Sequence, residues 1–397
     1  MSKSSSTIGR WIAAVLAFLL LLGIFTNLVI DNMPKGDARH IEGYHAWEKE
    51  TLEVADSIPV HNGGRVKPFS TYAGFTMLGL HGARSMKVLD EHGKAVRITP
   101  TAWLMDTLFR PQLAIKLPTF RIDNSAVLEA ISVKPLGKRD RYSYEDIEPG
   151  RTKLIELAKT YEAIEKTKRD PVQDQTVALA YNLREYESLL GYFGFARFGV
   201  TLHGSGKEGA PDQRADISAV MMTAPQIRAQ IAQSQARGTA VDSHLASLME
   251  QVLDGANFAK FGLFILPPSN SKEELWLTAG NAIFNTFNDP KSDSVLAVKD
   301  IKELESVARS IGDSEATFRG ELTKLHDDLM KRAEVRGEGK HVGMEVHFYQ
   351  MDWFLNALAF FILGTITAFG MWMAGHGKVG RILTWVTCGC TSEDVGS

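Results

Sequence analysis

Residues 353–374 read WFLNALAFFILGTITAFGMWMA, a run without a single charged side chain. A second uncharged run, WIAAVLAFLLLLGIFTNLVI, occupies residues 11–30. A helix that crosses a membrane needs about 20 apolar residues, because each residue adds about 1.5 Å to its length. Both runs are long enough, and Trp353 and Trp372 border the second run as interfacial aromatic residues do. The sequence therefore predicts two transmembrane helices.

Two other interpretations of these runs compete with membrane crossing. A cleaved signal peptide would explain residues 11–30, since Lys3 and Arg10 give the chain a basic start. However, the apolar run exceeds the usual length of about 7–15 residues, and no small-x-small cleavage site follows it. A buried core helix would explain residues 353–374, but their uncharged length argues against it. We expect an uncleaved anchor at 11–30 and a second span at 353–374.

The segment between the two runs, residues 31–352, is hydrophilic and must lie on one side of the membrane if both runs cross it. Lys378 and Arg381 follow the second run without a nearby acid, which favours a cytoplasmic C-terminus. We therefore expect cytoplasmic tails at 1–10 and 375–397. Residues 31–352 would form a periplasmic (extracytoplasmic) domain at the inner, cytoplasmic membrane.

Composition excludes several classes of protein. The 397 residues are 44% hydrophobic and 23% charged, which is typical of globular proteins. Lys+Arg 44 against Asp+Glu 47 leaves a net charge of −3, so no basic excess indicates nucleic acid as a partner. The two cysteines, Cys388 and Cys390, are too close in sequence to staple a domain and have no histidine partner nearby. A disulfide-rich scaffold and a multi-cysteine metal site are therefore excluded.

Residues 31–352 are expected to be mainly helical with a small β element. Apolar residues recur at helical spacing through most of the segment, and Thr99-Pro100 predicts the N-cap and first residue of a helix that stops before Pro111. The Gly-rich stretch GSGKEGAPDQRA, residues 204–215, predicts a flexible break. The predicted fold class is mainly α with a small β element, in which two transmembrane helices flank one large extracytoplasmic α-rich domain.

The predicted β element lies at residues 58–68, IPVHNGGRVKP, where two short extended pieces flank an Asn-Gly-Gly turn. Arg65 and Lys67 are two residues apart, so on a strand their side chains project to the same face. Three interpretations remain open for this pair. It receives an anion such as a haem propionate or a phospholipid head group, or it belongs to a solvated strand edge whose charges prevent aggregation. In the third, which we favour, it pairs internally with acids of residues 31–352 and serves the fold.

Signatures of catalysis and cofactor binding are absent from the sequence. There is no Gly-x-Gly-x-x-Gly after a strand, Walker loop, Gly-x-Ser-x-Gly elbow or His-Glu-x-x-His. There is also no Cys-x-x-Cys-His, so the chain does not carry covalent c-type haem itself. His341 and His347 lie near the second apolar run, and we expect both to be surface or hydrogen-bonded residues. No catalytic, cofactor-binding or metal-ligating residue is predicted.

A family resemblance begins at the predicted hairpin. IPVHNGGRVKPFSTYA resembles the signature Pro-Val-x-x-x-Gly-Arg-x-Lys-Pro-x-x-Thr of extracytoplasmic domains attached to CcsA/ResC-type cytochrome c assembly proteins. The matching positions are Pro59, Val60, Gly64, Arg65, Lys67, Pro68 and Thr71. The stretches TPTAWLMDTLFRPQLAIKLPTFRIDN, KRDRYSYEDI and ILPPSNSKEELW are similar to later elements of that family in the same order. EVHFYQMDWFLNALAFF is similar to its approach to the next membrane helix, through Glu345, Tyr349 and Phe354.

The resemblance implies a component of system II cytochrome c maturation, which attaches haem to apocytochrome c. Gly64, Arg65, Lys67, Pro68 and Thr71 would then form a binding or structural motif. The family's Trp-rich, haem-handling membrane region has no counterpart in this chain. Haem would accordingly be handled by a partner, a multi-span membrane subunit. The chain would dock that subunit or apocytochrome c beside the lipid bilayer without catalytic activity of its own.

Two further functions belong to other classes. Two spans around an exterior domain are also the architecture of a membrane sensor or receptor, although residues 375–397 are too few for a signalling domain. An exterior enzyme is the third hypothesis, and the missing catalytic signatures disfavour it. No nucleic acid is expected as a partner under any of the three.

Overall fold

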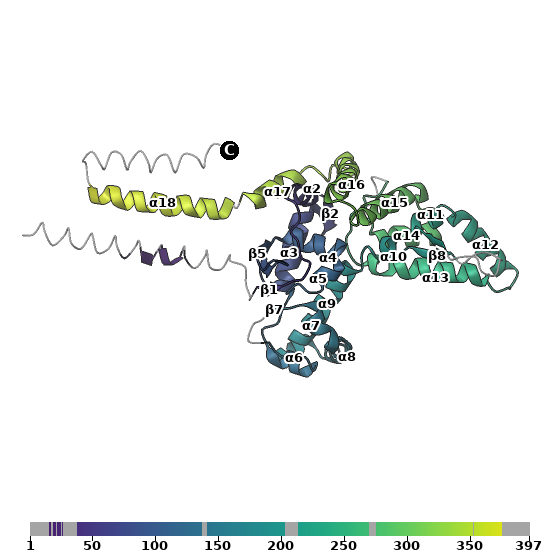
Figure 1. Cartoon of the computed structure of the whole chain (residues 1–397), viewed down its shortest axis with the longest axis horizontal. Helices are drawn as coiled ribbons and strands as arrows, with labels where there is room; N and C mark the ends of the chain where they lie inside the picture. Colours follow the sequence, from purple (N-terminus) through teal and green to yellow (C-terminus); the bar gives the residue numbers. More distant parts are fainter. Residues whose placement is uncertain are drawn as a thin grey trace, which may run out of the picture. The chain divides into compact units, whose positions relative to one another are not determined.

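The structure is a computed structural model that describes residues 16, 19–20, 22–24, 26, 38–136, 141–202, 213–269, 275–351 and 353–374. The described residues fall into two compact units. One lies within Pro34–Val346 and holds almost all of the secondary structure. The other lies within Met1–Met33 together with His347–Ser397. Figure 1 follows the chain through both.

The prediction of two transmembrane helices is wrong. Within the part of the chain that the structure describes, no helix combines the length and the apolarity that crossing a membrane requires. Residues 353–374 do form a helix, α18 (Trp353–Ala374). Most of 11–30, and both predicted tails, lie outside the described residues.

The protein is mainly helical with small sheets. In chain order, the helices are α2 (Lys49–Asp56), α3 (Phe69–His81), α4 (Pro100–Phe109), α5 (Pro111–Ala114), α6 (Ser125–Ala130), α7 (Tyr144–Ile147), α8 (Arg151–Glu162), α9 (Pro171–Leu190), α10 (Gly194–Phe198), α11 (Ile217–Met221), α12 (Ala224–Ala236), α13 (Ser243–Asn257), α14 (Ala279–Asn288), α15 (Ser294–Ser310), α16 (Glu315–Val335), α17 (Val342–Gln350) and α18. Short 3-10 turns are η1 (Glu148–Gly150), η2 (Lys166–Lys168) and η3 (Phe258–Lys260).

Four small sheets accompany these helices. The largest has three strands in the order β1-β4-β5, with β1 parallel and β5 antiparallel to the central strand. The other three are antiparallel pairs, β2-β3, β6-β7 and β8-β9. The strands are β1 (Arg39–His40), β2 (Pro59–Asn62), β3 (Arg65–Pro68), β4 (Met86–Leu89), β5 (Ala95–Ile98), β6 (Phe120–Arg121), β7 (Arg141–Tyr142), β8 (Val200–Leu202) and β9 (Gln213–Ala215).

Helix α4 lies at the centre of the core of this unit. Every residue from Thr101 to Phe109 is buried, and the helix packs against α2, α3 and α9. Its Trp103 is fully buried and donates its indole N–H to the Thr119 hydroxyl at 3.1 Å. A buried aromatic side chain needs such a partner for its polar atom. This helix therefore connects the early and middle parts of the chain.

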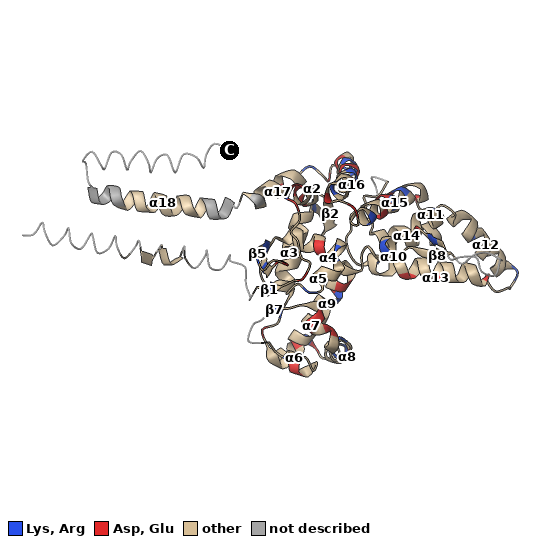
Figure 2. Ribbon diagram, in the orientation of Figure 1, with Lys and Arg blue, Asp and Glu red and all other residues tan. Residues whose placement is uncertain are grey.

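The last long helix of this unit, α16, packs against α15 and also against α2, the first helix of the unit. Acidic and basic residues are interspersed along its sequence, and its ribbon in Figure 2 carries both red and blue segments. Its buried side is apolar and includes Phe318, which meets Trp47 at a ring distance of 5.3 Å and Phe109 at 5.1 Å. The segment before α2, the end of α4 and the start of α16 therefore share one aromatic core.

Several local predictions can be compared with these elements. Thr99 is confirmed as an N-cap, because its hydroxyl accepts from the Ala102 amide, and the helix that follows ends before Pro111. The predicted break at 204–215 coincides in part with 203–212, which lie outside the described residues. Its last three residues are the strand β9, paired with β8, so this end of the predicted break is regular structure.

Candidate functional site

The predicted motif forms a β-hairpin, as the sequence indicated. Strands β2 and β3 pair antiparallel with Asn62 opposite Arg65, which leaves two residues in the turn. Gly63 and Gly64 occupy that turn with φ values of +62° and +79°. Positive φ at both positions is characteristic of the type I′ hairpin turn and strains any residue with a Cβ atom. Gly64 therefore has a structural role in shaping the tip of the hairpin.

Arg65 forms a two-pronged ion pair with Glu345, a residue of α17. Its Nη1 atom donates to Glu345 Oε2 at 2.6 Å and its Nη2 atom to Oε1 at 2.9 Å. The Arg65 side chain is 53% exposed and that of Glu345 only 17%. Bidentate pairs of this kind fix orientation as well as charge. We call the contact between the hairpin and α17, made by Arg65 and Glu345, the clasp.

The other polar members of the motif surround the clasp. Lys67 is half-buried and donates to the Asn62 side chain at 3.0 Å, across the hairpin. Thr71 is buried in the first turn of α3, and its hydroxyl makes no hydrogen bond of good geometry with the described residues. Arg65 lowers the pKa of Glu345 most, with smaller effects from Thr71 and Lys67, while partial burial opposes them. Burial, followed by the charge of Arg65, lowers the pKa of Lys67.

The remaining members have structural positions. Pro68 ends β3, lies opposite Pro59 and occupies the N-cap position of α3 with an extended backbone. Thr71 follows one turn later. The histidines near the C-terminal end of the domain, His341 and His347, are both exposed, as the sequence analysis expected. The structure therefore brings the predicted motif together and adds Glu345 to it.

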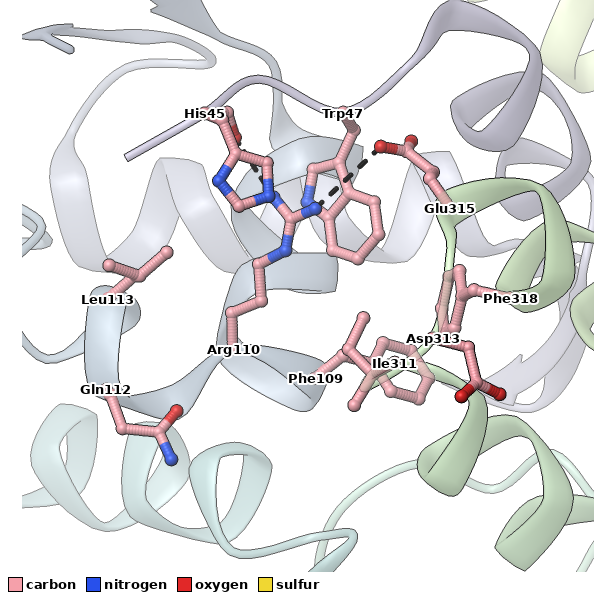
Figure 3. A pocket seen from close by; sticks show the side chains of 10 residues that line it. All are labelled: His45, Trp47, Phe109, Arg110, Gln112, Leu113, Ile311, Asp313, Glu315 and Phe318. Atoms are coloured by element: carbon pink, nitrogen blue, oxygen red, sulfur yellow. Dashed lines mark hydrogen bonds and ion pairs between the residues drawn. The ribbon is translucent and has the colours of Figure 1, made fainter. Parts of the chain in front are cut away.

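A second candidate site is a pocket of about 320 Å³ that the sequence analysis missed (Figure 3). Arg110 lies at the junction of α4 and α5, and its side chain extends into the pocket toward His45 and Trp47. The Arg110 guanidinium stacks on Trp47 at 3.4 Å from the ring centre and donates to the His45 carbonyl at 3.0 Å. Glu315, the first residue of α16, lies on the far side, with Nη2 and Oε2 separated by 3.9 Å.

Asp106 lies fully buried beside this pocket. It accepts hydrogen bonds from the Trp47 indole at 2.8 Å and the Tyr44 hydroxyl at 3.1 Å, and it lies 3.6 Å from Arg110 Nη1. Burial raises the pKa of Asp106 to about 7, although Arg110 and the two hydrogen bonds oppose that shift. One sequence signal could have found this site. Asp106 and Arg110 are the charged residues of the otherwise apolar stretch TAWLMDTLFR, one helical turn apart.

A metal site is suggested by three carboxylates, Asp300, Glu303 and Asp328, whose oxygen atoms lie within 4.8 Å of one another. Arg332, however, donates to both oxygens of Asp300, at 2.8 and 3.2 Å, and Lys299 pairs with the other two acids. The cations already balance most of the negative charge. This cluster is best explained as an ion network between α15 and α16.

A groove of about 750 Å³ lies beside β2. Its walls include His61, the exposed face of α9 around Tyr181 and Glu185, and the aromatic rings of Phe258 and Phe261. Glu187, also at this groove, is bound to Arg151 and Tyr144. Burial raises the pKa of Glu185.

Comparisons with known proteins do not assign this chain to a family. Searches of protein-family models, of curated proteins and of solved structures each found no match to this chain.

Proposed function

We propose that the domain within Pro34–Val346 is a docking component of system II cytochrome c maturation. It would position apocytochrome c, or the multi-span membrane subunit that handles haem, on the outer side of the cytoplasmic membrane. The chain would assist haem attachment without holding haem itself. The proposal rests on the motif resemblance, and the clasp supplies its structural support.

The observation that carries the proposal is the contact between Arg65 and Glu345. These residues belong to two stretches that the resemblance selected independently, and they are 280 residues apart in the chain. A chance similarity in two distant stretches gives no reason for their side chains to form a bidentate ion pair. A shared motif gives such a reason, because residues retained together commonly act together in one surface.

The chemistry of the clasp suits docking. Its hairpin tip, residues 62–65, is exposed, while β3 leads directly into the buried helix α3. The tip is therefore a rigid projection on a stable base. Arg65 remains half exposed and can contact a partner while Glu345 fixes its orientation. Preorganised charged groups lower the entropy cost of forming an interface.

The test measures cytochrome c yield with variants of the full chain. Arg65→Ala combined with Lys67→Ala should lower haem-stained cytochrome c several-fold at equal abundance of the variant. Arg65→Glu combined with Glu345→Arg restores the ion pair with its charges exchanged. If partners bind the hairpin surface, this charge-swapped variant should fold normally and still give a low yield of cytochrome c.

The matched control is Arg309→Ala. Arg309 pairs with Asp216 at 2.6 Å and is 51% exposed, so it resembles Arg65 in both contact and accessibility. Its loss should leave the yield unchanged. A normal yield in the double alanine variant, at wild-type abundance, would overturn the proposal. A swap variant that restores full yield would reduce the clasp to a purely structural contact.

A further inference from the structure

The pocket around Arg110 contains a buried cation with hydrogen-bond donors to spare. The Arg110 residue is only 9% exposed, and its Nη1 atom is occupied by the His45 carbonyl. The 3.9 Å between Nη2 and Glu315 Oε2 is an ion pair but too long for a hydrogen bond. Among the described residues, Nη2 and Nε have no hydrogen-bond acceptor. Both donors belong to a side chain that lines the pocket, so an acceptor on a ligand that enters the pocket can take the place of water there.

Asp106 does not supply the missing acceptor for Nη2 and Nε of Arg110. Its two oxygens already accept from Trp47 and Tyr44, and burial raises its pKa to about 7. Near neutral pH it is therefore protonated in a large fraction of molecules. The positive charge of Arg110 is then balanced mainly by Glu315 at the opposite wall.

Beside Glu315, the same pocket presents a second carboxylate, Asp313, that no described cation pairs with. Glu315 accepts the Glu48 amide with Oε1 at 2.6 Å, which leaves Oε2 facing Arg110 across the 3.9 Å gap. Asp313 lines the pocket, is exposed, and has no side-chain partner among the described residues. Figure 3 shows Asp313 and Glu315 on the side of the pocket opposite Leu113. A ligand cation would find two carboxylates there.

Apolar side chains supply the remaining walls. Phe109 and Phe318 are buried aromatic residues that contact each other, and Leu113 and Ile311 also line the pocket. The volume of about 320 Å³ is at the lower end of the range for small-molecule sites. The pocket therefore suits a small ligand with an apolar body and charges of both signs.

We propose that this pocket binds a small zwitterion, an α-amino acid with an apolar side chain. The carboxylate would accept from Arg110, the ammonium would donate to Asp313 and Glu315, and the side chain would contact Phe109 and Phe318. A ligand of one sign would satisfy only one half of the pocket. None of these residues belongs to the clasp, so this site is independent of the proposed function.

Isothermal titration of the full chain tests the ligand class. L-leucine should bind with saturation at one site. N-acetyl-L-leucine lacks the ammonium and L-leucinamide lacks the carboxylate, so each should bind at least tenfold more weakly. Absence of saturable leucine binding would overturn the proposal. So would leucinamide or the acetylated compound binding as tightly as leucine, since the site would then recognise a plain cation or a plain anion.

Two variants locate the binding. Asp313→Asn is a surface change that should weaken leucine binding about tenfold without altering the fold. Asp254→Asn removes an exposed carboxylate on α13, far along the chain from the pocket residues, and should leave binding unchanged. Arg110→Gln should abolish binding, with circular dichroism confirming that the variant is folded. Equal affinities in the Asp313 and Asp254 variants would show that leucine binds elsewhere and would overturn the proposal.

Discussion

Arg65 and Lys67 differ in what their loss should cost. Removing Arg65 leaves the less exposed Glu345 carboxylate without its bidentate partner, whereas Lys67 gives up one hydrogen bond to Asn62. We expect Arg65→Ala to lower the free energy of unfolding by about 1 kcal/mol and Lys67→Ala by less than about 0.5 kcal/mol. Urea denaturation measures both. Equal and negligible effects would show that the clasp contributes nothing to stability.

The clasp also has a pH dependence with a definite sign. Because Arg65 lowers the pKa of Glu345, the contribution of the ion pair is present above the ordinary glutamate pKa and is lost as the pH falls below it. The difference in unfolding free energy between wild type and Arg65→Ala should therefore shrink in acid. A difference that grew below pH 4 would contradict the assigned pairing.

Asp106 should behave in the opposite way. Its pKa is raised to about 7 in the folded protein, so its protonated form favours folding. Its contribution is fully present below the unfolded pKa near 4 and is lost as the pH rises through about 7. Relative to Asp106→Asn, the wild type should lose about 1–4 kcal/mol of stability between pH 4 and pH 8. A flat difference between the two proteins over this range would contradict a buried, protonated Asp106.

Residues that act with close sequence neighbours could be predicted, and those with distant partners could not. The spacing of Arg65 and Lys67 placed both on one strand, and the hairpin confirms this. Nothing in the local pattern identifies Glu345 as the acid that pairs with Arg65, because the two meet only after the intervening helices have folded. The Arg110 pocket was missed for the same reason, since Glu315 reaches it from another helix.

At the scale of elements, α14 depends on a glycine for its close approach to η3. A Cβ atom on Gly280 would lie 2.3 Å from the Ala256 carbonyl oxygen and 2.5 Å from the Lys260 amide nitrogen. Both are backbone atoms and cannot move aside cheaply. We expect Gly280→Ala to lower the free energy of unfolding by about 1–3 kcal/mol, measured by thermal or urea denaturation.

The control for this change is Gly320→Ala in α16. A Cβ atom there meets nothing within 4 Å, and the residue is exposed within a helix. Alanine should stabilise this position by about 0.5–1 kcal/mol, because it restricts the unfolded chain and favours helix. If both glycine variants were stabilised, the close contact between α14 and η3 would be wrong.

Elements could be predicted from sequence where a short-range signal defines them. Thr99-Pro100 fixes the start of α4, and the Gly-Gly turn fixes the β2-β3 hairpin. Strand β9 was missed because its residues Gln213–Ala215 are polar and became a strand only through pairing with β8. The membrane spans were inferred from the length of two uncharged runs and from the bordering Trp353 and Trp372, but no helix of the described residues is long and apolar enough to cross a membrane.

For the whole molecule, His81 adds a third pH effect. It is buried, its Nδ1 atom contacts the Pro118 carbonyl at 2.8 Å, and burial, helped by the charge of Arg141, lowers its pKa to about 4. As the pH falls, His81 is protonated in the unfolded chain at a higher pH than in the folded protein. Its contribution to stability is therefore lost as the pH falls from about 6.5 toward 4. Relative to His81→Asn, the wild type should lose stability in that window. A constant difference would indicate that His81 titrates normally.

Haem binding tests the part of the proposed function in which a partner subunit, and not this chain, holds haem. His341 and His347 are exposed, and no Trp-rich haem-handling region was found in the sequence. We expect the purified chain to bind no stoichiometric haem, as measured by the Soret absorbance after haem addition and desalting. A strong Soret band that disappears in a His341→Ala or His347→Ala variant would show that the chain itself holds haem.

Because Arg65 and Glu345 are 280 residues apart, the ribosome makes them at different times. A ribosome adds about 5–20 residues per second, so the hairpin is made roughly 15–60 s before the acid that completes the clasp. The delay between the synthesis of Trp47 and that of Phe318, its neighbour in the aromatic core, is almost as long. During this interval the nascent chain exposes surfaces that its own later helices will cover. A chain released before α16 is made would keep them exposed and become a substrate for chaperones and proteases.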